Sequence, residues 1–292
     1  MLKAWQPQTT ADGSITFFSP EFQETFHSSS GAEEEALHKF VMPSGLATLA
    51  QEWIVGQTPL KILDVCYGLG YNTAAALATI WQVNPACAVE VLAWELELTV
   101  PQAALGFLKS YPPPIPELLT TLATELKVDI PRLQGRLEIG DARKTIQRSS
   151  LDWRADVIFL DPFSPPKCPQ LWSIEFLALL AQHLQPQGKI ITYSCAAAVR
   201  TALLQAGLYI ASTPSVGRKN PGTIASPSPL EFPPLTSAEL EYLQTRAAVP
   251  YQDPHLKDEA ATIRQRRTQE QTSSHLEPTS KWKKRWSSPR AT

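Results

Sequence analysis

Four carboxylates stand where apolar, strand-like runs of the sequence end. They are Asp64, Glu95, Asp141 and Asp161. In a doubly wound parallel sheet, the residues just beyond the carboxyl ends of the strands line the ligand crevice. Carboxylates placed there can accept hydrogen bonds from hydroxyl and amino groups. The spacing therefore predicts an acidic crevice along one edge of an α/β sheet.

The first of these carboxylates leads into a glycine turn. The turn after Asp64 contains Gly68 and Gly70, and an alanine-rich helix is expected from Asn72. Glycine lets a ligand approach the backbone, and the N–H groups of the helix start point the same way. A dinucleotide fingerprint would need a third glycine where Thr73 stands. The pattern resembles instead the nucleotide loop of S-adenosylmethionine (SAM)-dependent methyltransferases, and a simple tight βα turn is the alternative.

The later carboxylates have separate predicted roles. Glu95 directly follows the second apolar run and can accept hydrogen bonds from both ribose hydroxyls, while Glu97 shares its strand parity and is the competitor. In methyltransferases a carboxylate at the place of Asp141 meets the adenine amino group, although capping of the next helix would also explain it. Asp161 should face the reacting centre, in a loop that several prolines stiffen.

Composition limits the class of protein. With 292 residues and 43% hydrophobic content, the chain can form one large α/β core with an appendage. It has no apolar run of about 18 residues, and its N-terminus lacks the apolar centre of a signal peptide. We therefore expect a cytoplasmic protein without a membrane partner. The four cysteines lack metal-ligand spacing, so no metal is expected.

The chain divides into three expected regions. Residues 1–58 form an N-terminal hairpin and helical lid. Residues 59–226 form a Rossmann-like methyltransferase domain, with a seven-stranded, mostly parallel sheet that ends in an antiparallel pair. Residues 227–292 form a Pro/Ser-rich basic tail, largely disordered apart from a helix with Ser237 as its N-cap.

The tail carries a local excess of positive charge. From residue 263 onward, eight basic residues accompany two acidic ones, a local charge of +6 in a chain whose net charge is −2. Trp282 and Trp286 are interleaved with cations. Such a pattern suits nucleic acid, because cations meet phosphates and rings stack on unpaired bases. A solvated low-complexity tail is the alternative.

Several motifs together resemble the MnmC-like tRNA methyltransferase domain family, over about residues 14–226. The family's specific signature, Asp-x-Phe-x-Pro-x-Lys-x-Pro-x-x-Trp, occupies residues 161–172. The supporting segments are Glu24-Thr25-Phe26-His27-Ser28, Gly31-Ala32, Glu34-Glu35, the glycine loop, Val199-Arg200, Ala206-Gly207 and Gly217-Arg218-Lys219.

The resemblance implies methyl transfer from SAM to the aminomethyl group on carbon 5 of a tRNA wobble uridine, without the flavin oxidase of the larger fused proteins. The residues expected to bind cofactor are Asp64, Tyr67, Gly68, Gly70, Asn72, Glu95, Asp141 and Asp161, with Asp161 also catalytic. The residues expected to bind substrate or tRNA are Phe26, Phe163, Lys167, Arg218, Lys219, Lys283, Lys284 and Arg285.

Two positions depart from the family pattern. Pro162 stands where a Gly or Ala is usual, and Cys168 stands where an Asn is usual. Both leave the carboxylate of Asp161 in place, so they concern the range of substrates. Asp161 would orient the amine and take its proton directly or through water. The alternatives are a small-amine or polyamine transferase related to spermidine synthase, and a non-catalytic protein with the SAM fold.

Overall fold

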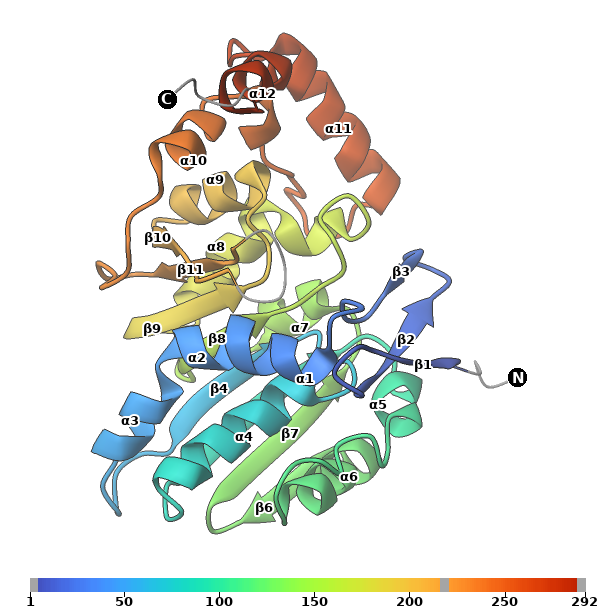
Figure 1. Ribbon diagram of the computed structural model, residues 1–292, viewed down its shortest axis with the longest axis vertical. Helices are drawn as coiled ribbons and strands as arrows, with labels where there is room; N and C mark the ends of the chain where they lie inside the picture. Colours follow the sequence, from blue (N-terminus) through green and yellow to red (C-terminus); the bar gives the residue numbers. More distant parts are fainter. Residues whose placement is uncertain (1–4, 216–220, 288–292) are drawn as a thin grey trace.

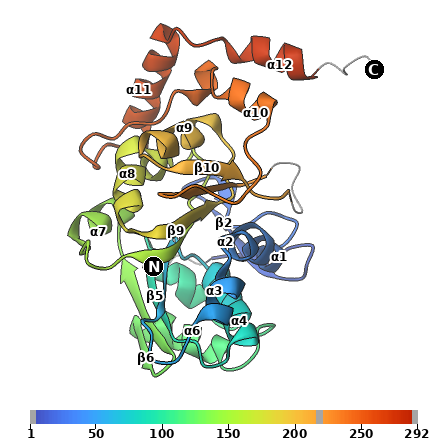
Figure 2. The same ribbon diagram turned by 90° about the vertical axis from the view of Figure 1, so that its left-hand side faces the viewer.

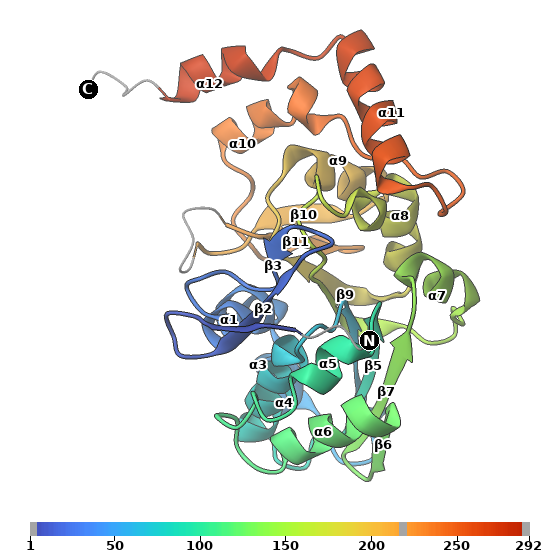
Figure 3. The same ribbon diagram turned by 90° about the vertical axis from the view of Figure 1, so that its right-hand side faces the viewer.

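The structure is a computed structural model that describes residues 5–215 and 221–287. A central sheet is covered by helices on both faces (Figure 1). The C-terminal helices α11 (Ala260–Ser273) and α12 (Thr279–Ser287) lie at the end of the molecule opposite β6 (Lys127–Ile130), as Figures 2 and 3 show.

The central sheet of the described residues has eight strands. In spatial order they are β10 (Tyr209–Ser212), β11 (Thr223–Ser226), β9 (Leu184–Thr192), β8 (Ala155–Leu160), β4 (Leu60–Val65), β5 (Val89–Glu95), β7 (Leu133–Ile139) and β6. The five strands from β9 to β7 are parallel. Strands β10, β11 and β6 pair antiparallel. The Rossmann-like α/β fold and the antiparallel closing pair are thus as expected.

The expected number of seven strands was one too low. The additional strand, β6, pairs with β7 at the edge of the sheet, with Lys127 opposite Arg136. Its sequence, KVDI, buries only Val128 fully. Since an edge strand needs one apolar contact and one partner strand, four residues of mixed polarity gave too weak a pattern to identify it.

Helices cover the sheet in two layers. One apolar cluster joins the sheet to η1 (Ala36–Val41), α3 (Leu46–Glu52), α4 (Tyr71–Val83) and α6 (Ile115–Glu125). The other joins it to α7 (Ala142–Arg148), η2 (Pro169–Trp172), α8 (Ile174–Gln182) and α9 (Ala197–Gln205). The short helices α2 (Met42–Ser44) and α5 (Thr99–Ala103) complete the layers. This two-sided burial explains why β4 and β8 are mostly apolar, with Lys61, Asp64 and Asp156 as their charged residues.

The N-terminal region contributes a small second sheet. Strands β1 (Pro7–Thr9), β2 (Ile15–Ser19) and β3 (Glu24–Thr25) form it, and α1 (Ala32–Glu35) follows. The hydroxyl of Tyr71 in α4 accepts a hydrogen bond from the amide of Ile15 (3.1 Å). It also donates one to the carbonyl of Ile15 (3.0 Å). The hairpin is thereby held beside the glycine loop, where α4 begins.

The expected disorder of the tail is wrong for its described residues. Besides α11 and α12, the region contains α10 (Ser237–Tyr242) and η3 (Arg246–Ala248). The N-cap of α10 is Thr236, in a capping box with Glu239, and not Ser237. No helix within the described ranges is long and apolar enough to cross a bilayer.

Polar contacts order this region. Arg267 donates to the carbonyls of Val249 (2.6 Å) and Ala247 (2.9 Å), and its guanidinium lies 4.5 Å from the ring centroid of Tyr251. Low apolar content predicted disorder because burial is the usual source of order. Here guanidinium groups satisfy buried carbonyls instead.

Candidate active site

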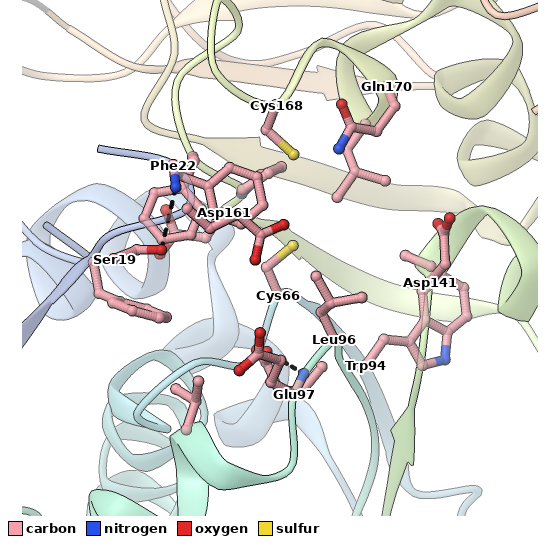
Figure 4. A pocket seen from close by; sticks show the side chains of 18 of the residues that line it. Ser19, Phe22, Cys66, Trp94, Leu96, Glu97, Asp141, Asp161, Cys168 and Gln170 are labelled. Atoms are coloured by element: carbon pink, nitrogen blue, oxygen red, sulfur yellow. Dashed lines mark hydrogen bonds between the residues drawn. The ribbon is translucent and has the colours of Figure 1, made fainter. Parts of the chain in front are cut away.

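A cavity of about 270 Å³ opens at the carboxyl ends of β4, β5, β7 and β8. Its wall includes Cys66, Glu95, Asp141 and Asp161, each supplied by the end of a different strand. Figure 4 shows Cys66, Asp141 and Asp161 around this cavity. Three of the four predicted carboxylates therefore meet in one crevice. The fourth, Asp64, does not line it.

Asp64 lies behind the glycine loop, fully buried. Its Oδ2 accepts a hydrogen bond from the hydroxyl of Thr73 (2.7 Å), and no partner among the described residues reaches Oδ1. Burial raises the pKa of this carboxyl to about 7, against the opposing effect of the Thr73 hydrogen bond. The side chain therefore ties the end of β4 to α4 and is placed to support the loop.

The glycine loop has the left-handed backbone that its sequence indicated. Gly68 has φ +57° and Gly70, the residue before α4, has φ +87°. A Cβ on Gly70 would lie 2.6 Å from the hydroxyl oxygen of Tyr67. Tyr67 is buried against the loop and does not line the cavity. Its side chain therefore supports the turn from behind.

Glu95 links the glycine loop to the segment that follows β5. Its two carboxylate oxygens accept hydrogen bonds from the amides of Gly68 (2.9 Å) and Glu97 (3.0 Å). Burial raises the pKa of Glu95, in opposition to these hydrogen bonds. Glu95 and Glu97 both line the cavity. Only Glu95 is hydrogen-bonded to the glycine loop, which makes it the better placed of the two competitors.

Asp141 caps α7, and it also faces the cavity. Its Oδ1 accepts from the amide of Arg143 (2.9 Å), and its Oδ2 pairs with the Arg143 guanidinium at 2.7 Å. The same guanidinium pairs with Asp253 at 2.8 Å. Sequence reasoning missed Arg143, because its second carboxylate partner lies 110 residues further along the chain.

Asp161 follows β8, half-buried, and its Oδ2 accepts a hydrogen bond from the side-chain amide of Asn72 (3.0 Å). The carbonyl of the next residue, Pro162, accepts from the hydroxyl of Tyr193 (2.8 Å). The indole of Trp172 donates to the carbonyl of Phe163 (2.9 Å). The loop that carries Asp161 is therefore fixed at three points, and Trp172 acts as a packing residue.

A second cavity, of about 430 Å³, shares Asp161 with the first. Its wall combines Asp161, Phe163 and Tyr193 with residues of the N-terminal hairpin, including Phe26 and Glu24. Phe26, Asp161, Pro162 and Phe163 line both cavities. Asp161 thus stands at the junction of two chambers.

The N-terminal hairpin is fastened to the Asp161 loop. Glu24 accepts hydrogen bonds from the amide of Ser164 (2.9 Å) and from its hydroxyl. Phe22 stacks on Phe163 with ring centroids 4.3 Å apart, and Phe26 meets Phe163 edge-on at 5.0 Å. The sequence offered no local signal for these roles of Glu24, Phe22 and Tyr193.

Two thiols, of Cys66 and Cys168, also line the first cavity (Figure 4). Burial raises the pKa of Cys168 to about 12 and that of Cys66 well above its usual range. Both are therefore neutral packing groups at ordinary pH. Among the described residues, no three His, Cys, Asp or Glu side chains gather as metal ligands would.

Among the described residues, the cations expected to bind tRNA lie on two separate elements. Lys167 is exposed beside the Asp161 loop, and Lys283 and Lys284 are exposed on α12. Arg285 forms ion pairs with Glu241 and Glu277. Arg218 and Lys219 lie outside the described residues.

The two indoles of α12 are used in packing. The indole nitrogen of Trp282 donates to the carbonyl of Ala238 (3.0 Å), and its ring lies 4.4 Å from that of Tyr242. The indole of Trp286 donates to Glu241 (2.9 Å). These contacts fasten α12 to α10. Stacking of the indoles on unpaired bases stays a prediction.

Comparisons with known proteins agree with this geometry. The profile of a family described as S-adenosyl-L-methionine-dependent methyltransferase matches residues 108–228. The crystal structure of MnmC2 from Aquifex aeolicus has a TM-score of 0.81 and 34% sequence identity, and the match covers 93% of this chain and 86% of that one.

Two curated relatives extend the comparison. An uncharacterised protein of Methanocaldococcus jannaschii is 34% identical over 253 residues, which are 84% of this chain and 66% of that protein. The tRNA 5-methylaminomethyl-2-thiouridine biosynthesis bifunctional protein MnmC of Ralstonia nicotianae is 29% identical over 236 residues. That match covers 75% of this chain and 34% of the bifunctional protein. Fold, strand-end carboxylates and these similarities together show that the chain belongs to the MnmC-like family of SAM-dependent methyltransferases.

Proposed function

We propose that the protein transfers the methyl group of SAM to the aminomethyl nitrogen of 5-aminomethyl-(2-thio)uridine at the tRNA wobble position, giving 5-methylaminomethyl-(2-thio)uridine. The observation that carries the proposal is the position of Asp161, at the junction of the two cavities. A carboxylate there can touch an amine on one side while a methyl donor lies on the other. Since tRNA is the proposed substrate, we expect the activity in the cytoplasm.

The residues of the first cavity suit SAM. Glu95 is placed for the ribose hydroxyls and Asp141 for the adenine amino group, since both carboxylates face the cavity. Gly68 does not line the cavity itself, but its amide donates to the carboxylate of Glu95 (2.9 Å), which does. When bound there, SAM supplies an electrophilic methyl group on a sulfonium.

Asp161 has two proposed tasks in the transfer. It accepts a hydrogen bond from the amine, which orients the nitrogen lone pair towards the methyl carbon. One C–S bond is then exchanged for one C–N bond, and the proton released from nitrogen passes to Asp161 directly or through water. Asn72 holds the carboxylate in place through its 3.0 Å hydrogen bond.

The second cavity is the proposed place of the nucleoside. Phe26, Phe163 and Tyr193 offer ring surfaces on which an unpaired pyrimidine can stack. Lys167 lies in the loop that carries Asp161, and Lys283 and Lys284 lie on α12. All three lysines are proposed to contact tRNA phosphates.

The test is methylation of tRNA that carries the 5-aminomethyl group, followed by mass spectrometry of the wobble nucleosides. Isotope-labelled SAM should deliver one labelled methyl group to the aminomethyl nitrogen. Asp161→Ala should abolish transfer, because general-base and orienting contributions are worth roughly 10²–10⁴-fold, while SAM binding largely persists. Near-normal turnover by Asp161→Ala would refute the role of this carboxylate. Absence of transfer by the unaltered protein would refute the proposed substrate.

A further inference from the structure

The C-terminal region forms part of the cofactor cavity. Glu259, which precedes α11, lines it directly. The segment before it is attached to the body of the domain at Tyr251, whose carbonyl accepts from the amide of Ile174 (3.1 Å). The amide of Asp253 donates to the carboxylate of Glu175 (2.8 Å). Residues 251–258 are therefore attached to the domain and hold Glu259 at the wall of the cavity.

Asp253 is the buried anchor within this segment, with no exposed surface. Its Oδ1 accepts from the amides of Lys257 (3.0 Å) and Asp258 (3.1 Å), which closes a tight turn. Its Oδ2 accepts from a terminal nitrogen of Arg143 at 2.8 Å. The charge of this buried carboxylate is balanced by the guanidinium of Arg143, which lines the cofactor cavity.

Arg143 uses opposite edges of its guanidinium for two different partners. One terminal nitrogen donates to Asp253 and to the carbonyl of Asp258 (2.9 Å). The other terminal nitrogen and Nε both donate to Asp141, at 2.7 and 3.1 Å. A planar fork of donors can hold two carboxylates in fixed relative orientation, which the point charge of a lysine cannot do. The direction of the Asp141 carboxylate is thus set by an anchor in the C-terminal segment.

We propose that Arg143, anchored by Asp253, is a positioning residue that aims the Asp141 carboxylate at the adenine amino group of the cofactor, so that residues 251–259 are a working part of the cofactor site. The proposal rests on the cofactor site assigned above. It predicts that recognition of the amino group depends on Arg143, although Arg143 itself need not touch the cofactor.

The test compares two non-reactive cofactor analogues that differ at one group. S-adenosylhomocysteine carries the adenine amino group, and S-inosylhomocysteine carries an oxygen at the same place. We would measure the Kd of each for the full chain by titration calorimetry, without tRNA. The informative quantity is the ratio of the two Kd values, because damage to the cavity in general changes both and leaves the ratio alone.

The unaltered protein should prefer the adenine analogue by roughly tenfold or more, as expected for one hydrogen bond to a charged group. In Arg143→Gln this preference should fall towards one, chiefly through weaker binding of the adenine analogue. Asp253→Asn should lower it in the same direction, and Arg143→Lys should restore only part of it. Arg266→Gln is the matched control: Arg266 pairs with Asp258 in the same segment but does not contact Asp141, so the ratio should stay at its original value.

An unchanged preference in Arg143→Gln would overturn the proposal, and so would an equal loss for both analogues. The unpaired charge of Asp253 could prevent Arg143→Gln from folding. In that case the ratio of the two Kd values is measured on the double variant Arg143→Gln/Asp253→Asn, which removes both charges. The readout contains no tRNA, so failure of the proposed methyl acceptor would leave these results intact. Conversely, an Asp161→Ala variant without turnover says nothing against Arg143.

Discussion

Asp64→Asn should make the stability of the protein less dependent on pH. The carboxyl of Asp64 has a pKa of about 7 in the folded protein, raised by burial, against 3.8 as the ordinary value. Between pH 4 and pH 7 the folded state therefore holds a proton that the unfolded chain has released. The free energy of unfolding consequently falls as pH rises through this window, and the contribution of the neutral carboxyl is lost above pH 7.

The size of the effect follows from the shift. Each pH unit inside the window lowers the free energy of unfolding by about 1.4 kcal/mol. The full pKa shift of Asp64 therefore corresponds to roughly 4 kcal/mol. Asparagine has nearly the same shape and carries no titrating proton, and its side-chain oxygen can still accept from Thr73. Any constant cost of the new amide cancels when the variant is compared with the original protein at two pH values.

The assay is urea unfolding of both proteins at pH 5 and pH 7. The free energy of unfolding of Asp64→Asn, minus that of the original protein, should grow by roughly 2.3 kcal/mol between these values, because a group with a pKa of about 7 is already half-titrated at pH 7. Binding of S-adenosylhomocysteine should be nearly unchanged, since Asp64 does not line the cavity. A difference that does not change with pH would refute the titration, and a loss of binding of tenfold or more would show that Asp64 contacts the ligand.

Two further variants test the loop and the tRNA surface. Gly70→Ala should destabilise the fold and weaken cofactor binding, because φ is +87° and the new Cβ would lie 2.6 Å from the Tyr67 hydroxyl; the backbone strain alone is roughly 1–2 kcal/mol. Adding Tyr67→Phe should recover only the part due to the hydroxyl, measured by thermal unfolding, since the ring carbon Cζ would still lie 2.9 Å from the new Cβ. An equally stable Gly70→Ala would contradict the left-handed assignment. Lys283→Ala with Lys284→Ala should lower the salt dependence of tRNA binding by up to about 1.8 in the log–log slope, if each lysine meets one phosphate. An unchanged slope would exclude α12 from the tRNA interface.

Much of the central sheet could be predicted from sequence because its elements are local patterns. The run from Ala155 to Leu160 is apolar apart from Asp156, as is typical of a strand buried on both faces, and its predicted bounds match β8. Strand β6 escaped because an edge strand needs little apolar content. Helices α11 and α12 escaped because polar contacts between distant segments order them, and such contacts leave no local pattern.

The strand-end carboxylates mark the limit of what the sequence by itself determined. It placed Glu95, Asp141 and Asp161 at one edge of the sheet, because parallel strands bring their carboxyl ends together. Only the tertiary structure decided that Asp64 turns into the interior and that Arg143 joins Asp141 to Asp253. The direction of a side chain and its pairing with a residue 110 positions away depend on how the layers pack, and no periodicity of the chain encodes that packing.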